Sequence, residues 1–172
     1  MTRSVYRITG PDRINFLQGL ITGDMRRLPL YAALLTPQGK YLADFFVVDE
    51  GDALLLDLDA AQADDVIRRL SLYKLRSDVA IEKTDIAVTR GTGAPPEGAI
   101  ADPRHPALGW RGYGVGADDG TDWDALRIEH LIPEAGAELI PNETFILEAG
   151  FERLNGVDFR KGCYVGQEVT AR

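Results

Sequence analysis

A cysteine and a lysine near the C-terminal end of the sequence form its most reactive combination of side chains. Lys161 precedes Cys163 by two residues, so in an extended stretch both side chains lie on one face. A nearby ammonium favours the reactive thiolate form of cysteine. Gly162 and Gly166 flank the cysteine and allow unusual backbone dihedral angles. A lone cysteine is often a small buried apolar residue, but the polar neighbours here favour a functional thiol.

The content of cysteine and histidine limits the metal chemistry of the chain. Cys163 is the single cysteine, and His105 and His130 are the two histidines. An internal disulfide and a zinc site with two thiolate ligands are therefore excluded. Iron–sulfur clusters normally take four cysteine thiolates, so this chain does not hold a stable [4Fe–4S] cluster alone.

Asp44 is a second candidate, because it interrupts the otherwise apolar segment 41–48. A carboxylate in apolar surroundings is costly unless it is paired or accepts hydrogen bonds. The alternative is a solvent-facing position on an edge strand, and the sequence leaves both possibilities open.

Composition describes an ordinary acidic globular protein. The chain has 172 residues, of which 45% are hydrophobic and 27% charged, and its formal net charge is -8. This charge argues against a general nucleic-acid binder, which needs a basic surface. No apolar run approaches the roughly 18 residues of a membrane span, and the N-terminus has no apolar signal core. We therefore expect no membrane partner and a cytoplasmic location.

The elements that position these residues are read from hydrophobic spacing and turn residues. A hairpin turn is predicted at 36–39 from its proline and glycine. Short, largely apolar segments between turns predict strands at 5–8, 31–35, 41–48, 53–58, 79–81, 86–89 and 109–115. Helical spacing and caps predict helices at 11–23, 59–72, 122–130 and 144–154. Hairpins interspersed with helices indicate an α+β fold. The loop 91–98 is the predicted seam between a first subdomain, 1–90, and a second, 99–172.

The segment 161–168, Lys-Gly-Cys-Tyr-Val-Gly-Gln-Glu, resembles the signature of the YgfZ family of folate-binding proteins. This family is implicated in the assembly or repair of iron–sulfur clusters and has mitochondrial counterparts. Weaker blocks occur in the order found in the family, at 8–24, 35–44, 72–79, 102–104 with 109–111, and 132–150. The resemblance therefore covers nearly the whole chain.

The family shares its fold with the T-protein of glycine cleavage, an aminomethyltransferase. This resemblance implies two interlocked α+β subdomains with mixed or antiparallel sheets around a central hole, followed by a C-terminal β-barrel. The sequence ends at Arg172, directly after the signature, so we expect a shortened member without the barrel. The T-protein has an Asp-Asp pair where this chain has Ala43-Asp44, which argues against aminomethyl transfer.

The implied ligand is tetrahydrofolate or a derivative, bound non-covalently. A carboxylate accepts the row of N–H donors on a pterin ring, and Asp44 and Glu148 are the candidates for this role. Tyr164 is expected to pack on a flat ring. The anionic glutamate tail needs cations, and the candidates are Arg127, Arg153, Arg160 and Lys161.

These observations lead to a main hypothesis with two alternatives. The main hypothesis is a tetrahydrofolate-binding accessory protein for iron–sulfur proteins, with client or assembly proteins as partners and Cys163 as a functional thiol. One alternative is a tetrahydrofolate-dependent one-carbon enzyme of the aminomethyltransferase or demethylase kind. The other is a non-catalytic interaction domain that has lost folate binding.

Overall fold

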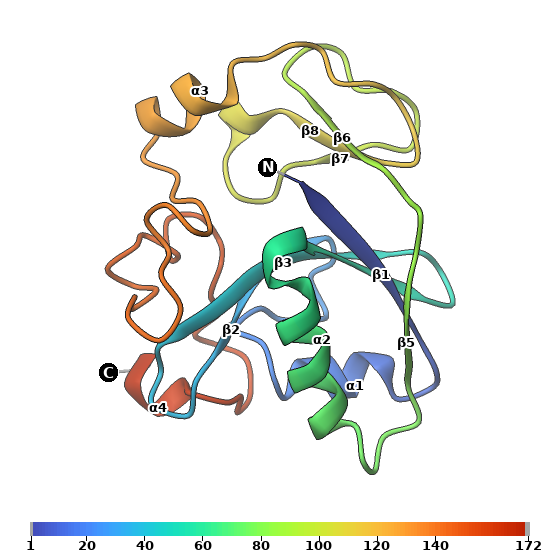
Figure 1. Ribbon diagram of the computed structural model, residues 1–172, viewed down its shortest axis with the longest axis vertical. Coiled ribbons are helices and arrows are strands. Elements are labelled where there is room, and N and C mark those ends of the chain that lie inside the picture. The colour runs from blue at the N-terminus through green and yellow to red at the C-terminus, as the bar shows by residue number, and fades with distance from the viewer. Residues whose placement is uncertain (1, 171–172) are drawn as a thin grey trace.

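The computed structural model describes residues 2–170, and its strands form a five-stranded and a three-stranded sheet (Figure 1). The larger sheet has the order β2-β3-β4-β1-β5 with antiparallel neighbours throughout. Its strands are β1 (Arg3–Thr9), β2 (Leu30–Leu35), β3 (Tyr41–Asp49), β4 (Leu54–Asp59) and β5 (Ala80–Lys83). The predicted α+β class with antiparallel sheets is confirmed.

Two helices, α1 (Arg13–Gln18) and α2 (Ala60–Tyr73), cover one face of the larger sheet. On β4, the fully buried Leu54, Leu56 and Leu58 share the apolar cluster of these helices. The Asp59 carboxylate accepts the backbone N–H of Ala61 at 2.9 Å and caps α2, as predicted. The first helix is shorter than predicted and ends at Gly19 rather than near Gly23. No helix within residues 2–170 is long and apolar enough to cross a membrane.

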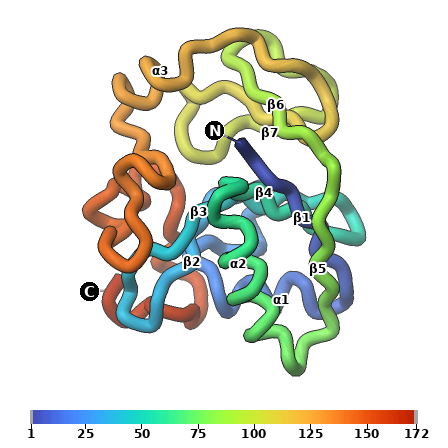
Figure 2. Tube along the Cα trace, viewed as in Figure 1, coloured from blue at the N-terminus to red at the C-terminus, as the bar shows by residue number. Residues whose placement is uncertain are grey.

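The smaller sheet and the C-terminal third of the chain cover the opposite face of the larger sheet. The smaller sheet has the order β6-β8-β7 and lies near α3 in Figures 1 and 2. Its strands are β6 (Val88–Gly91), β7 (Ile100–Ala101) and β8 (Trp110–Tyr113). Because β6 pairs with β8, the second sheet begins before the loop predicted as the seam. The division into 1–90 and 99–172 stays a prediction.

The predicted helix at 144–154 is wrong, because this segment consists of consecutive turns. Gly150 has a φ of 85°, which interrupts a right-handed helix. Ile146, Phe151 and Leu154 are nevertheless buried against β2 and β3. The remaining helices are the 3₁₀ turn η1 (Pro106–Leu108), α3 (Trp123–Glu129) and α4 (Gln167–Thr170). The helix predicted at 122–130 is thus confirmed as α3, with the Asp122 carboxylate as its cap.

Candidate functional site

A cavity of about 1140 Å³ lies between the face of β3 and β4 turned away from the helices and the smaller sheet. Strand alternation explains its polar lining, since Asp44 and Phe46 on β3 point to the face opposite Ala43 and Phe45. The N-termini of α2 and α3 complete the wall. The residues that carry the chemistry of this cavity are Arg3, Asp44, Phe46, Arg90, Arg104, Arg111 and Trp123.

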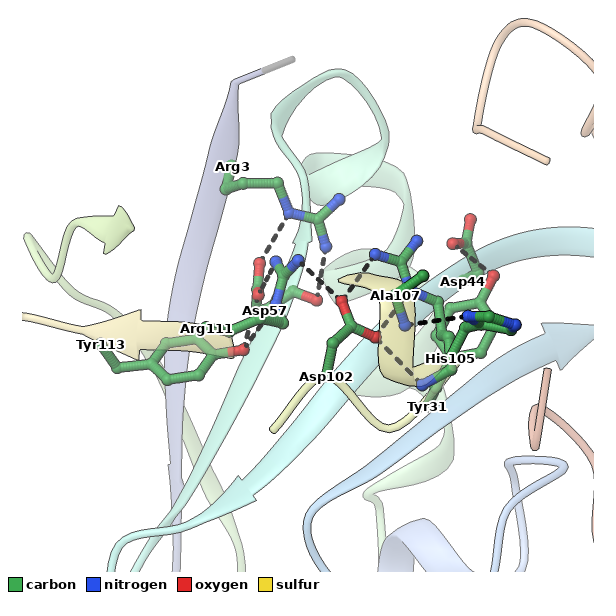
Figure 3. Close-up of polar contacts among 10 residues, drawn as sticks. Arg3, Tyr31, Asp44, Asp57, Asp102, His105, Ala107, Arg111 and Tyr113 are labelled. Atoms are coloured by element: carbon green, nitrogen blue, oxygen red, sulfur yellow. Dashed lines mark hydrogen bonds and ion pairs between the residues drawn. The ribbon is translucent and has the colours of Figure 1, made fainter. Parts of the chain in front are cut away.

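Asp44 is 8% exposed and lies on the central strand β3, not on an edge strand. Its carboxylate accepts a hydrogen bond from the Tyr31 hydroxyl at 2.9 Å (Figure 3). It accepts a second hydrogen bond from the Tyr41 hydroxyl at 2.5 Å. Burial, and then the carboxylate itself, raise the pKa of both phenols, so both stay protonated at neutral pH. A carboxylate has about four acceptor positions, so roughly two remain for a ligand in the cavity.

Asp57 connects the two sheets below the cavity. This fully buried carboxylate on β4 accepts from Arg3 Nε at 2.7 Å, Arg111 Nη2 at 2.6 Å and the Tyr113 hydroxyl at 2.7 Å (Figure 3). Burial would raise the pKa of Asp57, but Arg111 and Arg3 outweigh it and hold the pKa at about 2. The aspartate is therefore ionised at neutral pH and neutralises charge on the cavity floor.

A second ion pair, between the buried Asp102 and the partly buried Arg104, continues this network. Arg104 Nη2 lies 2.8 Å from one carboxylate oxygen of Asp102, and Arg111 Nη1 lies 3.8 Å from the same oxygen. The guanidinium groups of Arg111 and Arg104 also lie 3.9 and 4.9 Å from the ring centroid of Phe46. The floor of the cavity is thus a set of guanidinium groups fixed by carboxylates and an aromatic ring.

Arg90 differs from its neighbours in this cavity. Its guanidinium lies 3.8 Å from the ring centroid of Trp123, and its buried Nε has no hydrogen-bond partner. Burial, followed by repulsion from Arg111 and Arg104, lowers the pKa of Arg90 to about 9. The side chain is therefore still a cation at neutral pH.

Lys161 uses its ammonium on backbone carbonyl groups, and its predicted effect on the Cys163 thiol stays a prediction. The side chain is buried, and its Nζ donates to the carbonyl oxygens of Gln18, Ile21 and Gly23 at 2.6–2.7 Å. The structure thus directs the ammonium to the turn after α1, where it fixes the backbone. Burial lowers the pKa of Lys161 to about 8.

Cys163 is exposed, so the alternative of a buried apolar cysteine is wrong. It does not line the cavity that contains Asp44, and its role as a functional thiol stays a prediction. Tyr164 is buried in the second apolar cluster, with the Lys161 ammonium 5.0 Å from its ring centroid. The structure therefore places the Tyr164 ring in the core, where it does not face the Asp44 cavity.

Glu148, Arg127 and Arg153 line a second cavity of about 720 Å³, which adjoins the first at Pro133. The structure therefore does not bring Glu148 to the same cavity as Asp44. Arg127 forms ion pairs with acidic residues, and Arg153 donates to the carbonyl oxygens of two residues at the end of α3. Arg160 is exposed on the surface. The predicted cations for an anionic tail are thus outside the main cavity.

Sequence reasoning assigned no role to several residues that build the cavity. Tyr31 and Tyr41 have the sequence context of ordinary strand residues. Pairing of β2 with β3 brings Tyr31 to Asp44, whereas Tyr41 lies three residues before Asp44 on β3 itself. Arg104 and Arg111 occur in blocks that resemble the family, but nothing local indicates that they face Asp57 and Asp102. Arg90 and Trp123 are 33 positions apart and give no sequence signal for their contact.

Comparison with known proteins gives relatives over nearly the whole chain, although no family model matches. The iron–sulfur cluster assembly factor IBA57 homolog of Mycosarcoma maydis, a mitochondrial protein by name, is 32% identical and covers 99% of this chain. The corresponding proteins of Phaeosphaeria nodorum and Homo sapiens are 34% and 30% identical, also over 99% of this chain. The alignments cover 51%, 50% and 60% of the three relatives, so this chain spans about half of their length.

Among solved structures, the glycine cleavage system aminomethyltransferase T of Bartonella henselae matches 50% of this chain and 25% of its own. The sequence identity is 16% and the TM-score 0.46, which is too low to support an argument about the fold. The sequence relatives, which align with 99% of this chain, confirm the predicted resemblance: homologues of this chain are IBA57 iron–sulfur cluster assembly factors of the YgfZ family.

Proposed function

We propose that this chain binds tetrahydrofolate in the Asp44 cavity and acts as an accessory protein in the assembly or repair of iron–sulfur clusters. The names of the relatives support the role in cluster assembly. The observation that carries the ligand is the position of Asp44, a buried carboxylate with spare acceptor capacity that faces a cavity.

The polar groups of the cavity fit a reduced pterin. A pterin presents adjacent N–H donors, and one carboxylate accepts two of them in parallel. Tyr31 and Tyr41 keep the Asp44 carboxylate in place and leave acceptor positions free. Asp44 would therefore hold and orient the ring, while the tetrahydrofolate would supply one-carbon or redox chemistry when bound.

The size and charge of the cavity also fit this ligand class. Small-molecule sites commonly measure about 300–1,000 Å³, and this cavity is slightly larger at about 1140 Å³. Phe46 and Trp123 provide aromatic surface in its lining. The Arg90 guanidinium in its wall supplies positive charge for an anionic group of the ligand, even though the chain as a whole has a net charge of -8.

Cys163 is proposed to meet the partner or the cluster cargo outside the cavity. Its thiol is exposed, and the glycine before it leaves open space on that side of the backbone. Since a cluster takes about four thiolates, a transient contact through Cys163 requires the other ligands to come from a partner protein.

Calorimetric titration with 5-formyltetrahydrofolate tests the ligand. We expect wild-type chain to bind, and Asp44→Asn to bind about 10- to 100-fold more weakly, because a charged acceptor is lost. Asp52→Asn, in the exposed turn between β3 and β4, is the matched control and should bind as wild type. Absence of heat with the wild-type chain, or equal affinity in Asp44→Asn, would contradict the proposal.

The role of Cys163 is tested separately, by the activity of iron–sulfur enzymes in cells that lack their own assembly factor of this family. Cys163→Ser should restore less enzyme activity than the wild-type chain while keeping folate affinity, since the residue lies outside the cavity. Full restoration by the serine variant would remove the thiol from the proposal and leave the folate site standing.

A further inference from the structure

Arg90 is a cation in the wall of the main cavity without a partner for its charge. It lies on β6, and its guanidinium stacks on Trp123 at the start of α3. Within residues 2–170, the side chain forms no hydrogen bond and no ion pair, and its Nε is buried without a partner. An arginine in such surroundings normally contacts an anion, because its donors otherwise lose their hydration without replacement.

The other cations of the cavity are already neutralised. Arg3 and Arg111 contact Asp57, and Arg104 contacts Asp102. Asp102 attracts Arg90 electrostatically but lies beyond ion-pair distance of it. Among the described cavity residues, Arg90 is thus the cation that forms no ion pair with a carboxylate.

The carboxylates of the cavity wall are likewise engaged elsewhere. Asp44 accepts two phenols, and Asp118 accepts the backbone N–H of Arg90 itself at 2.7 Å. The others cap helices or contact Arg127: Asp59 and Asp122 cap α2 and α3, and Asp124 and Glu134 lie 3.2 and 3.5 Å from Arg127 Nε. Between residues 2 and 170, no carboxylate forms an ion pair with the Arg90 side chain, which is therefore available to an anionic group of a ligand.

The contact with Trp123 prepares Arg90 for such a ligand. A guanidinium that stacks on an aromatic face keeps its N–H donors at the edge, where they form two parallel hydrogen bonds with an oxyanion. The stacked geometry also lowers the entropy lost when the ligand binds. Burial and the repulsion from Arg111 and Arg104 lower the pKa of Arg90, and attraction to an incoming negative charge would offset both effects.

We propose that Arg90, held against Trp123, is an oxyanion-recognition site of the main cavity that binds a carboxylate or phosphate group of the cavity ligand. The identity of the whole ligand rests on the proposed function. When the ligand is a tetrahydrofolate, the group that Arg90 binds is a carboxylate of its glutamate tail. This assigns the tail to Arg90 and not to Arg127, Arg153, Arg160 or Lys161.

The test removes the ligand's carboxylates and the arginine, singly and together. Calorimetry compares 5-formyltetrahydrofolate with 5-formyltetrahydropteroate, which lacks the glutamate, on wild type and Arg90→Gln. We expect wild type to prefer the glutamate-bearing ligand about tenfold or more, and Arg90→Gln to bind both ligands equally. Arg69→Gln removes an exposed positive charge on α2 and should behave as wild type. A preference for the tail that survives in Arg90→Gln overturns the proposal and leaves folate binding intact.

A second arm uses simple anions and does not depend on folate. The Nε–H signal of Arg90, identified by its loss in Arg90→Gln, is followed by NMR during titration with malonate and with inorganic pyrophosphate. A saturable shift with malonate indicates a carboxylate site, and a shift with pyrophosphate alone indicates a phosphate site. A shift without any pteridine binding supports the oxyanion site and refutes the proposed function, whereas no response to either anion or to either pteridine refutes both.

A stability measurement separates ligand recognition from a structural role. Because the Arg90 side chain forms no hydrogen bond within residues 2–170 that the substitution would remove, Arg90→Gln should unfold within about 3 °C of the wild-type Tm without ligand. A large fall in Tm would show that the arginine stabilises the fold and would contradict a residue kept free for a ligand.

Discussion

Substitution of Lys161 tests whether this lysine of the segment 161–168 stabilises the fold or activates the Cys163 thiol. The perturbation is Lys161→Met, which keeps a long apolar stem and removes the ammonium. In the structure, this ammonium donates to the carbonyl oxygens of Gln18, Ile21 and Gly23. Three acceptors match the three N–H donors of a protonated lysine, so we expect the group to stabilise the fold rather than to activate the thiol.

The expected cost follows from the acceptors left behind. The hydrogen bonds to the Ile21 and Gly23 carbonyls are buried, and the one to Gln18 is partly buried. Leaving a buried acceptor without a donor costs about 1–3 kcal/mol, and relief from burying the charge offsets part of this. We therefore expect Lys161→Met to lower the free energy of unfolding by about 2–4 kcal/mol.

Urea unfolding followed by circular dichroism measures this cost, with alkylation of Cys163 measured on the same variants under native conditions. Lys83→Met, on the exposed edge strand β5, is the matched control and should change stability by less than about 0.5 kcal/mol. We expect the alkylation rate of Cys163 to stay near that of the wild type. Unchanged stability together with a much slower alkylation rate would refute the structural role and place the ammonium at the thiol.

The network below the cavity and one close backbone approach give the remaining predictions. Asp57→Ala leaves the buried Arg111 guanidinium without this carboxylate and should lower the free energy of unfolding in urea by about 3–5 kcal/mol. The control Asp52→Ala should change the free energy of unfolding by about zero. Because the pKa of Asp57 is lowered from 3.8 to about 2, its contribution, on the order of 2 kcal/mol, is present above about pH 4 and lost as the pH falls through 2. Urea midpoints from pH 6 to 2 should show this loss in the wild type and less of it in Asp57→Asn; parallel curves would contradict it. Gly166→Ala places a Cβ 2.6 Å from a backbone oxygen at a φ of 84° and should lower Tm by several degrees, whereas Gly162→Ala meets nothing within 4 Å and should leave Tm unchanged.

Local signals predicted the elements whose determinants are local. The proline and glycine of the 36–39 turn and the cap at Asp59 gave the hairpin and α2, because each depends on neighbours in sequence. The segment 144–154 misled the prediction because its apolar spacing serves burial against β2 and β3, whereas Gly150 at positive φ decides its backbone. Helical spacing alone does not report that dihedral angle.

The candidate site was predictable only where an apolar context made a polar residue conspicuous. Asp44 satisfied this condition, and the structure places it in a cavity. Glu148 and Lys161 were chosen from a motif and its spacing, and tertiary packing takes them to a second cavity and to a backbone turn. Arg90 was missed because its distinguishing property is the absence of a partner among residues 2–170, which only three-dimensional contacts reveal.

The contacts of Lys161 also order the events of folding. The ammonium reaches backbone atoms 138 to 143 positions earlier in the chain, and Thr22 donates to the Gly156 carbonyl across 134 positions. During synthesis, these late residues emerge last. The turn after α1 therefore gains its contacts with them only after the first strands have been synthesised. Loops of this length are slow to close, and we expect closure of this corner to limit the rate at which the chain reaches its native state.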